Sequence, residues 1–326
     1  MRLLLDAAIQ PATIERLRGL SPDLDVVDVT DDTFDVETLR DPEVEVLIGS
    51  RAPSDLSRVP SLRWLQVRQA GVSHLAADPP WRKGLLVTNA RGVFAVPIAE
   101  YVTGMLLRVH QPAAWATDQA AHRWPDHDVE ATVLRGRTAV IVGYGSIGRE
   151  VARQLAALGL RIVAVKPRPE IRRDVSFRVP GTGDPDGTIP DAIVGVETLA
   201  EAVREADVVV LTLPLTDASR RLVDARVLAA FPPTAWLVNV SRGAVIDEPA
   251  LLEALRGDRL AGAILDVFTE EPLPPDSPWW DAPNVIVTPH ASGVTMRWFG
   301  DLVVENVRRY LAGEPLLNPV DPERGY

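Results

Sequence analysis

Short β-branched runs alternate with amphipathic stretches from one end of this 326-residue chain to the other. This alternation is the pattern of parallel βαβ units, in which a covering helix follows each strand. In the first part of the chain, the predicted strands are residues 3–5, 26–29, 44–48, 62–67 and 85–88. In the second part, they are residues 138–142, 161–165, 207–213, 236–240, 263–267 and 285–288. We therefore expect an α/β fold with two parallel sheets.

Two helical stretches indicate how the chain is divided into domains. A long helix is predicted behind Pro97, in AVPIAEYVTGMLLRVH, and it leads from the first domain to the second. The closing TMRWFGDLVVENVRRYLAGEP repeats the helical period and is expected to pack back on the first domain. We therefore predict a Rossmann-type doubly wound domain, residues 97–291, inserted into a smaller flavodoxin-like α/β domain, residues 1–96 and 292–326. The proline-, glycine- and aspartate-rich stretch 167–191 is interpreted as a surface excursion, not a separate domain.

Charge and composition exclude several classes of function. The net charge of -11 argues against nucleic acid or an anionic membrane as the main partner, because both require a basic surface. The chain has no cysteine, which excludes disulfides, zinc–thiolate sites and thiol nucleophiles and fits a cytoplasmic protein. No run of about 18 apolar residues occurs, so no membrane span is expected. His122 and His127 lie in a polar stretch without further ligands, so no metal site is predicted.

A glycine-rich turn opens the second series of strands. In RTAVIVGYGSIGREVARQLAALG, Gly143, Gly145 and Gly148 stand between a predicted strand and a predicted helix. A tight turn, a close approach of backbone to pyrophosphate, and strand–helix packing each require a glycine at this spacing. The start of the helix would then meet the phosphate charge. The turn therefore predicts a dinucleotide site, and the alternative is a glycine turn without a ligand.

The residues after the second strand of this series bear on which dinucleotide is bound. In an NAD site, an acidic residue about 20 positions beyond the glycines bonds the ribose 2′-hydroxyl. Here the strand RIVAV leads into Lys166, Pro167 and Arg168, without an acid. Two cations there would pair with the 2′-phosphate of NADP, so we predict that NADP(H) is preferred and that NAD(H) is possible. The alternative is that Lys166 and Arg168 form a solvated loop.

Three polar residues follow three strands of the second series. Arg242 stands in NVSRGAVID, Glu271 in AILDVFTEEP and His290 in NVIVTPHASG. An arginine can bind a carboxylate with two parallel hydrogen bonds, a histidine can transfer a proton, and a glutamate can hold the imidazole charged. The three therefore predict hydride chemistry on a 2-keto acid. The alternatives are a strand-end ion pair for Arg242, Glu270 in place of Glu271 as the inward acid, and a merely packed His290.

Several segments in the same order resemble one known family. They are QAGVSHL, TNARGVFAVPIAEYV, VGYGSIG, LTLPLT, NVSRGAVIDEPALLEAL, GAILDVFTEEPLP, NVIVTPHASG and NPVDPERGY. With these the chain resembles the D-isomer-specific 2-hydroxyacid dehydrogenases, above all their glyoxylate/hydroxypyruvate reductase-like branch. The resemblance implies that Arg242 binds the substrate carboxylate and polarises the carbonyl, that His290 gives the carbonyl oxygen a proton, and that Glu271 pairs with His290. It also implies that the smaller domain binds the substrate and that the active site lies in the cleft between the domains.

Further roles are implied by the resemblance alone. The backbone amides of Ala70 and Gly71 would hold the substrate carboxylate. On the cofactor, Ser146 and Ile147 would contact the pyrophosphate, Leu213 and Pro214 the adenosine side, Val240 the nicotinamide ring and Asp266 its carboxamide. For Asp266, a helix or loop cap is the alternative. The stretch AAWATDQAAHRWPDHD resembles a region that packs across a twofold dimer, so a homodimer is expected, with Trp115 and Trp124 either at the interface or in the domain core.

The resemblance leaves other activities open. The family also contains formate and phosphite dehydrogenases. Non-catalytic transcriptional corepressors that sense a dinucleotide share the same architecture, so residues resembling a catalytic triad do not prove an enzyme. A small-molecule 2-keto or 2-hydroxy acid is nevertheless the expected partner.

Overall fold

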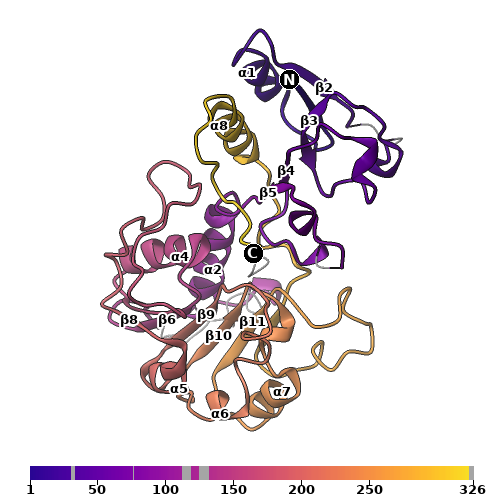
Figure 1. Cartoon of the computed structure of the whole chain (residues 1–326). Helices are drawn as coiled ribbons and strands as arrows, with labels where there is room; N and C mark the ends of the chain where they lie inside the picture. Colours follow the sequence, from indigo (N-terminus) through magenta and orange to yellow (C-terminus); the bar gives the residue numbers. More distant parts are fainter. Residues whose placement is uncertain (31–33, 76, 112–118, 125–131, 323–326) are drawn as a thin grey trace. The chain divides into compact units, whose positions relative to one another are not determined.

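The computed structural model describes residues 1–30, 34–75, 77–111, 119–124 and 132–322 (Figure 1). These residues form two compact units. Unit 1 comprises Met1–Phe94, Val175–Pro180 and Thr295–Tyr326, and unit 2 comprises Ala95–Asp174 and Gly181–Val294. Among the described residues, no helix has the length and apolarity that a membrane crossing requires.

Unit 1 is built on a parallel five-stranded sheet with the order β2-β1-β3-β4-β5, the flavodoxin-like order. Its strands are β1 (Arg2–Leu5), β2 (Asp25–Asp28), β3 (Val44–Gly49), β4 (Trp64–Val67) and β5 (Leu86–Thr88). The helices are α1 (Pro11–Arg18) and α8 (Phe299–Leu311), with short 3-10 turns η1 (Val36–Thr38), η2 (Leu56–Arg58), η3 (Ser73–Leu75) and η4 (Pro80–Lys83).

The core of unit 1 lies on both faces of this sheet because side chains alternate along each strand. Leu3 and Leu5 face one layer, together with Val303 and Val307 of α8. Leu4, between them, faces the opposite layer. Helix α8 thus belongs to this unit and packs close to α1.

Unit 2 is built on a parallel seven-stranded sheet with the order β12-β11-β10-β9-β6-β7-β8. Its strands are β6 (Thr138–Val142), β7 (Arg161–Val165), β8 (Ala192–Val194), β9 (Val208–Leu211), β10 (Trp236–Asn239), β11 (Gly262–Leu265) and β12 (Val285–Val287). The strand order reverses at β6, which is the switch point of a Rossmann-type sheet. The predicted fold class, with a doubly wound sheet and a smaller flavodoxin-like one, is thus confirmed.

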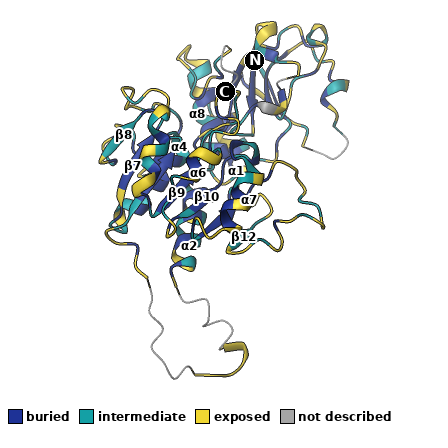
Figure 2. Ribbon diagram, turned by 90° about the horizontal axis from the view of Figure 1, so that it is seen from below, coloured by how far each residue is buried: buried dark blue, intermediate teal, exposed yellow. Residues whose placement is uncertain are grey.

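Helices cover the sheet of unit 2. They are α2 (Ala95–Val109), α4 (Ser146–Ala157), α5 (Leu199–Ala202), α6 (Ala225–Leu228) and α7 (Glu248–Arg256), with 3-10 turns η5 (Val196–Thr198), η6 (Val203–Glu205) and η7 (Gly243–Val245). Central strands such as β9 are buried along their whole length (Figure 2). This burial on both faces explains why these strands are near-continuous apolar runs in the sequence.

Two local features differ from the sequence-based expectation. Helix α2 begins at Ala95 and not behind Pro97, because a proline in the first turn gives up no intrahelical hydrogen bond. The tip of the excursion, Val175–Pro180, belongs to unit 1, where Phe177 is buried and its N–H donates to Asn318 Oδ1 at 3.0 Å. The excursion is therefore a shared element and does not lie only on the surface of the larger domain.

Candidate functional site

The glycine turn between β6 and α4 has the shape of a dinucleotide cradle. Gly143 has a φ of +98°, and a Cβ there would lie 2.8 Å from the nitrogen of Leu213. A Cβ on Gly148 would lie 2.2 Å from the oxygen of Gly143, so helix and turn are in direct contact. Around Gly145, in contrast, no atom of the described residues other than Gly145 and its two chain neighbours lies within 4 Å of a Cβ position. Since Gly145 precedes α4 without a side-chain cap, the positive end of the helix opens onto this space, which suits a pyrophosphate.

The other residues predicted for the cofactor surround this turn. Ser146 and Ile147 form the first turn of α4, and Leu213, with Pro214 after it, follows β9 against Gly143. Val240 follows β10 and donates its N–H to Leu211 O at 3.3 Å. The residues present therefore fit a dinucleotide, while each assigned contact with it stays a prediction.

Lys166 and Arg168 lie at the carboxyl end of β7, next to the glycine turn. The N–H of Gly143 donates to Val165 O at 2.9 Å, so Lys166 directly follows a residue that contacts the turn, and Arg168 lies two residues further along the chain. Lys166 donates from Nζ to Ile171 O at 2.6 Å, and Arg168 is exposed. This is the position that the ribose of a bound dinucleotide requires in such folds.

His290 and Glu271 form a hydrogen-bonded pair. His290 Nδ1 lies 2.8 Å from Glu271 Oε2, and the other carboxylate oxygen accepts the N–H of Phe268 at 2.8 Å. Since an ionised carboxylate only accepts hydrogen bonds, Nδ1 donates to Glu271. The other ring nitrogen, Nε2, is then the one that can exchange a proton with a substrate. The side chains are 48% and 36% exposed, so a small molecule can reach the pair. It is Glu271, and not Glu270, that contacts the histidine.

Asp266 holds the loop that carries His290. Its carboxylate, 1% exposed, accepts the N–H groups of Ala291 at 2.8 Å and Ser292 at 3.0 Å, while its backbone oxygen accepts the N–H of His290 at 2.8 Å. His290 itself has a φ of +53°, a conformation that a non-glycine residue keeps only where its surroundings enforce it. Asp266 thus acts as a loop cap, the alternative weighed above, and its contact with a carboxamide stays a prediction.

A threonine and a tyrosine extend this network of hydrogen bonds around Asp266. Thr288 donates to Asp266 Oδ1 at 2.6 Å, and Tyr101 of α2 lies 2.7 Å from the Thr288 hydroxyl. Burial, with the nearby Asp266 carboxylate, raises the pKa of Tyr101 to about 12, so its hydroxyl stays protonated at neutral pH. Sequence reasoning did not find Thr288 or Tyr101, because these bonds join residues far apart in the chain.

Arg242 is carried to the same edge of the sheet by β10, the neighbour of β11. The guanidinium donates to Ser241 O at 2.6 Å. The next residue, Gly243, packs so closely on the Glu271 loop that a Cβ would lie 2.0 Å from the carbonyl carbon of Phe268. The structure therefore brings together Glu271 and His290 through their side chains, and the loops of Arg242 and Glu271 through their backbones.

Ala70 and Gly71 lie in unit 1, on the loop that follows β4. Both are half-buried, and the carbonyl of the preceding Gln69 accepts the N–H of Ala90 at 2.9 Å. Their predicted contact with a substrate carboxylate stays a prediction.

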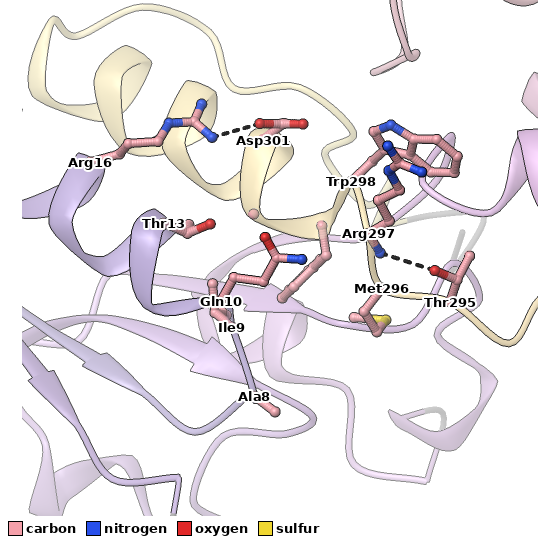
Figure 3. Close-up of a pocket in the computed structure, with 12 residues that line it drawn as sticks. Ala8, Ile9, Gln10, Thr13, Arg16, Thr295, Met296, Arg297, Trp298 and Asp301 are labelled. Carbon is pink, nitrogen blue, oxygen red and sulfur yellow. Dashed lines mark hydrogen bonds and ion pairs between the residues drawn. The ribbon is translucent and has the colours of Figure 1, made fainter.

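A cavity of about 800 Å³ lies elsewhere in unit 1, between the start of α1 and the start of α8 (Figure 3). At its rim, Arg16 pairs with Asp301 at 2.7 Å. None of the predicted site residues lines this cavity.

A nucleotide turn at the switch point of a parallel sheet, with an acid–histidine pair beyond two strands of that sheet, is typical of a dinucleotide-dependent oxidoreductase. Comparison with known proteins specifies which kind. Residues 102–292 match the family described as "D-isomer specific 2-hydroxyacid dehydrogenase, NAD binding domain". The chain belongs to this family of 2-hydroxyacid dehydrogenases.

Individual relatives agree with this assignment. The (S)-sulfolactate dehydrogenase of Chromohalobacter salexigens is 34% identical over 78% of this chain and 80% of its own. A D-isomer specific 2-hydroxyacid dehydrogenase from Xanthobacter autotrophicus, solved with NADPH and MES, is 31% identical with a TM-score of 0.78, covering 100% and 99% of the two chains. The NADPH-dependent glyoxylate/hydroxypyruvate reductase of Sinorhizobium meliloti, solved with NADP and sulfate, is 27% identical with a TM-score of 0.75 and the same coverage.

Proposed function

We propose that this protein is an NADPH-preferring reductase of a small 2-keto acid of the glyoxylate or hydroxypyruvate type. The observation that carries the proposal is the His290–Glu271 pair, held beyond β12 and β11 next to the loop of Arg242. The similarity to the Sinorhizobium meliloti reductase supports the substrate class.

In the proposed reaction, different residues of the chain bind the substrate and transfer the proton. The bound cofactor supplies a hydride for the keto carbon. Arg242 binds the substrate carboxylate and polarises the carbonyl. His290 donates the proton from Nε2 to the carbonyl oxygen, which yields a 2-hydroxy acid, and Glu271 holds the ring through Nδ1. The backbone amides of Ala70 and Gly71 are proposed to bind the substrate carboxylate as well.

The proposed preference for NADPH depends on Lys166 and Arg168. Changing both to glutamine should raise the KM for NADPH about tenfold or more, because each charge-assisted hydrogen bond to a phosphate is worth roughly 1.5–3 kcal/mol. The KM for NADH should stay nearly constant. Steady-state kinetics with both cofactors measures the difference.

A matched control is Arg161→Gln, at the opposite end of β7, where the arginine is exposed and lies 3.5 Å from Glu205. Equal effects of the double change on both cofactors would show that Lys166 and Arg168 do not select NADPH.

The adjacent glutamates offer a second comparison. Glu271→Gln should lower kcat about tenfold or more, as part of the roughly 10²–10⁴-fold that general acid catalysis contributes, because an amide does not stabilise the charged imidazole. Glu270→Gln should leave kcat unchanged, since Glu271 is the residue that contacts His290. If the two variants lose activity equally, the assigned acid is wrong.

The substrate class is tested by the initial rate of NADPH consumption with a panel of 2-keto acids. The panel includes glyoxylate, hydroxypyruvate and 3-sulfopyruvate, the keto form of sulfolactate. We expect fast turnover with glyoxylate or hydroxypyruvate. Fast turnover of 3-sulfopyruvate alone would move the substrate class to sulfonated acids. Absence of turnover with either cofactor would contradict the proposal and favour phosphite oxidation or a dinucleotide sensor.

A homodimer in the cytoplasm is proposed as well, on the family resemblance and the cysteine-free sequence. Trp115 lies outside the described residues. Trp124 is 90% exposed, which supports the interface role that the resemblance implied over a place in the domain core. Sedimentation of the purified protein measures the oligomeric state.

A further inference from the structure

The excursion 167–191 is fastened to the glycine-turn helix by a buried arginine. Arg149, in the first turn of α4, is 2% exposed. Its guanidinium donates to two backbone carbonyls on opposite arms of the excursion, Arg172 O at 2.5 Å and Asp184 O. The carboxylate of Asp174 lies 3.7 Å from Nε, which is an ion pair too long to be a hydrogen bond. A buried guanidinium is costly unless it is hydrogen-bonded, so these carbonyls are held firmly.

Neighbouring residues of the turn reinforce the attachment. The Arg149 guanidinium lies 4.7 Å from the ring centre of Tyr144, whose hydroxyl donates to Asp184 Oδ2 at 2.6 Å. Burial raises the pKa of Tyr144, so the hydroxyl remains a donor at every working pH. Glu150, which follows Arg149, accepts the N–H of Gly183 at 2.6 Å. Three residues of the nucleotide turn and its helix thus bind one arm of the excursion.

A short series of contacts connects Arg149 to Lys166, one of the two residues proposed to select NADPH. Arg149 holds the carbonyl of Arg172, and the preceding carbonyl, that of Ile171, accepts the ammonium of Lys166 at 2.6 Å. An ammonium group carries three donors, so a bond to Ile171 O is compatible with binding a phosphate oxygen. The position of the Lys166 ammonium therefore depends on where Arg149 fixes the 171–172 backbone.

We infer that Arg149, supported by Tyr144 and Asp184, is a positioning residue for cofactor choice: it fixes the excursion so that Lys166 faces the 2′-phosphate of NADPH. The inference rests on the proposed NADPH preference. Arg149 itself touches the excursion backbone and not the 2′-phosphate. Its effect should therefore appear in the affinity for NADPH and be absent with NADH, which has no 2′-phosphate for Lys166 to bind.

The test compares Arg149→Met with wild type in KM and kcat for both cofactors, with thermal unfolding measured in parallel. The KM for NADPH should rise about tenfold, the size expected for one lost charge-assisted hydrogen bond, while KM and kcat with NADH stay within about twofold. Tyr144→Phe should shift the KM for NADPH in the same direction by less. Arg256→Met, at an exposed position in the last turn of α7, is the matched arginine control.

Combination with the Lys166→Gln, Arg168→Gln double variant separates the two proposals. If Arg149 acts through Lys166, adding Arg149→Met to that background should change the NADPH:NADH ratio no further. Equal losses with NADPH and NADH, or an additive loss in the double-variant background, would overturn the positioning role. If the double variant itself leaves the ratio unchanged, the proposed NADPH preference fails instead. Should Arg149→Met not fold, Tyr144→Phe decides: a selective rise in the KM for NADPH supports the inference, and an equal rise for both cofactors overturns it.

Discussion

Replacing His290 with asparagine should lower kcat for keto-acid reduction by about 10²–10⁴-fold, the range that general acid catalysis contributes. The substitution removes the proton-carrying Nε2 and the bond of Nδ1 to Glu271. Asparagine tolerates the left-handed backbone that His290 adopts, so the loop should keep its shape. The Kd for NADPH, measured by cofactor fluorescence, should remain close to that of the wild type.

The chain offers a matched control for this change. His122 is exposed and has a φ of +51°, close to the +53° of His290, so His122→Asn makes the same substitution in the same backbone conformation. It should leave kcat unaltered. Full turnover by His290→Asn would refute the role of His290 as the proton donor.

The second large effect is expected from one methyl group, in Gly243→Ala. The added Cβ would lie 2.0 Å from the carbonyl carbon of Phe268 and 2.2 Å from the nitrogen of Thr269, and both are backbone atoms that cannot rotate away. Overpacking of this kind costs roughly 1–3 kcal/mol of stability. The displaced segment also carries the N–H that holds Glu271, so kcat should fall about a hundredfold, as a misplacement of 1 Å can cause.

Gly104→Ala is the matched control for this change. Gly104 is exposed in the middle of α2, where no described atom apart from its chain neighbours and the adjacent helix backbone lies within 4 Å of the new Cβ. The free energy of unfolding should rise there by up to about 1 kcal/mol, because alanine is the better helix former. Denaturant unfolding and kcat measured on both variants decide the matter. An active, stable Gly243→Ala enzyme would show that the loop of Glu271 can shift without losing its function.

The arrangement of the sheets could be predicted because it depends on local pattern. Buried strands such as β9 are nearly all apolar, and the spacing of the glycines identifies the turn between β6 and α4. Strand β8 was missed because Ala192–Val194 is short, only half-buried, and follows the proline- and glycine-rich excursion. Such a short strand is stabilised by its pairing with β7, and that long-range contact is not visible in the local sequence.

The candidate site could be predicted where the types of its side chains indicate chemistry. Arginine, glutamate and histidine at three strand ends are unusual enough to be noticed. The hydrogen bonds around Asp266 could not be predicted in this way, because a carboxylate after a strand can either contact a ligand or cap a loop. Only the fold brings the N–H groups of Ala291 and Ser292 to this carboxylate. Gly243 likewise resembles many turn glycines until the backbone of Phe268 is seen against it.

The membership of Val175–Pro180 in unit 1 affects how this chain can be dissected. A fragment cut at residues 97 and 291 would carry this tip without Asn318, whose side chain accepts its Phe177 N–H. It would also lose Gly92, against which the carbonyl of Phe177 is packed. An isolated nucleotide unit would therefore expose an aromatic side chain that the intact chain buries, and a soluble fragment would need a shorter excursion.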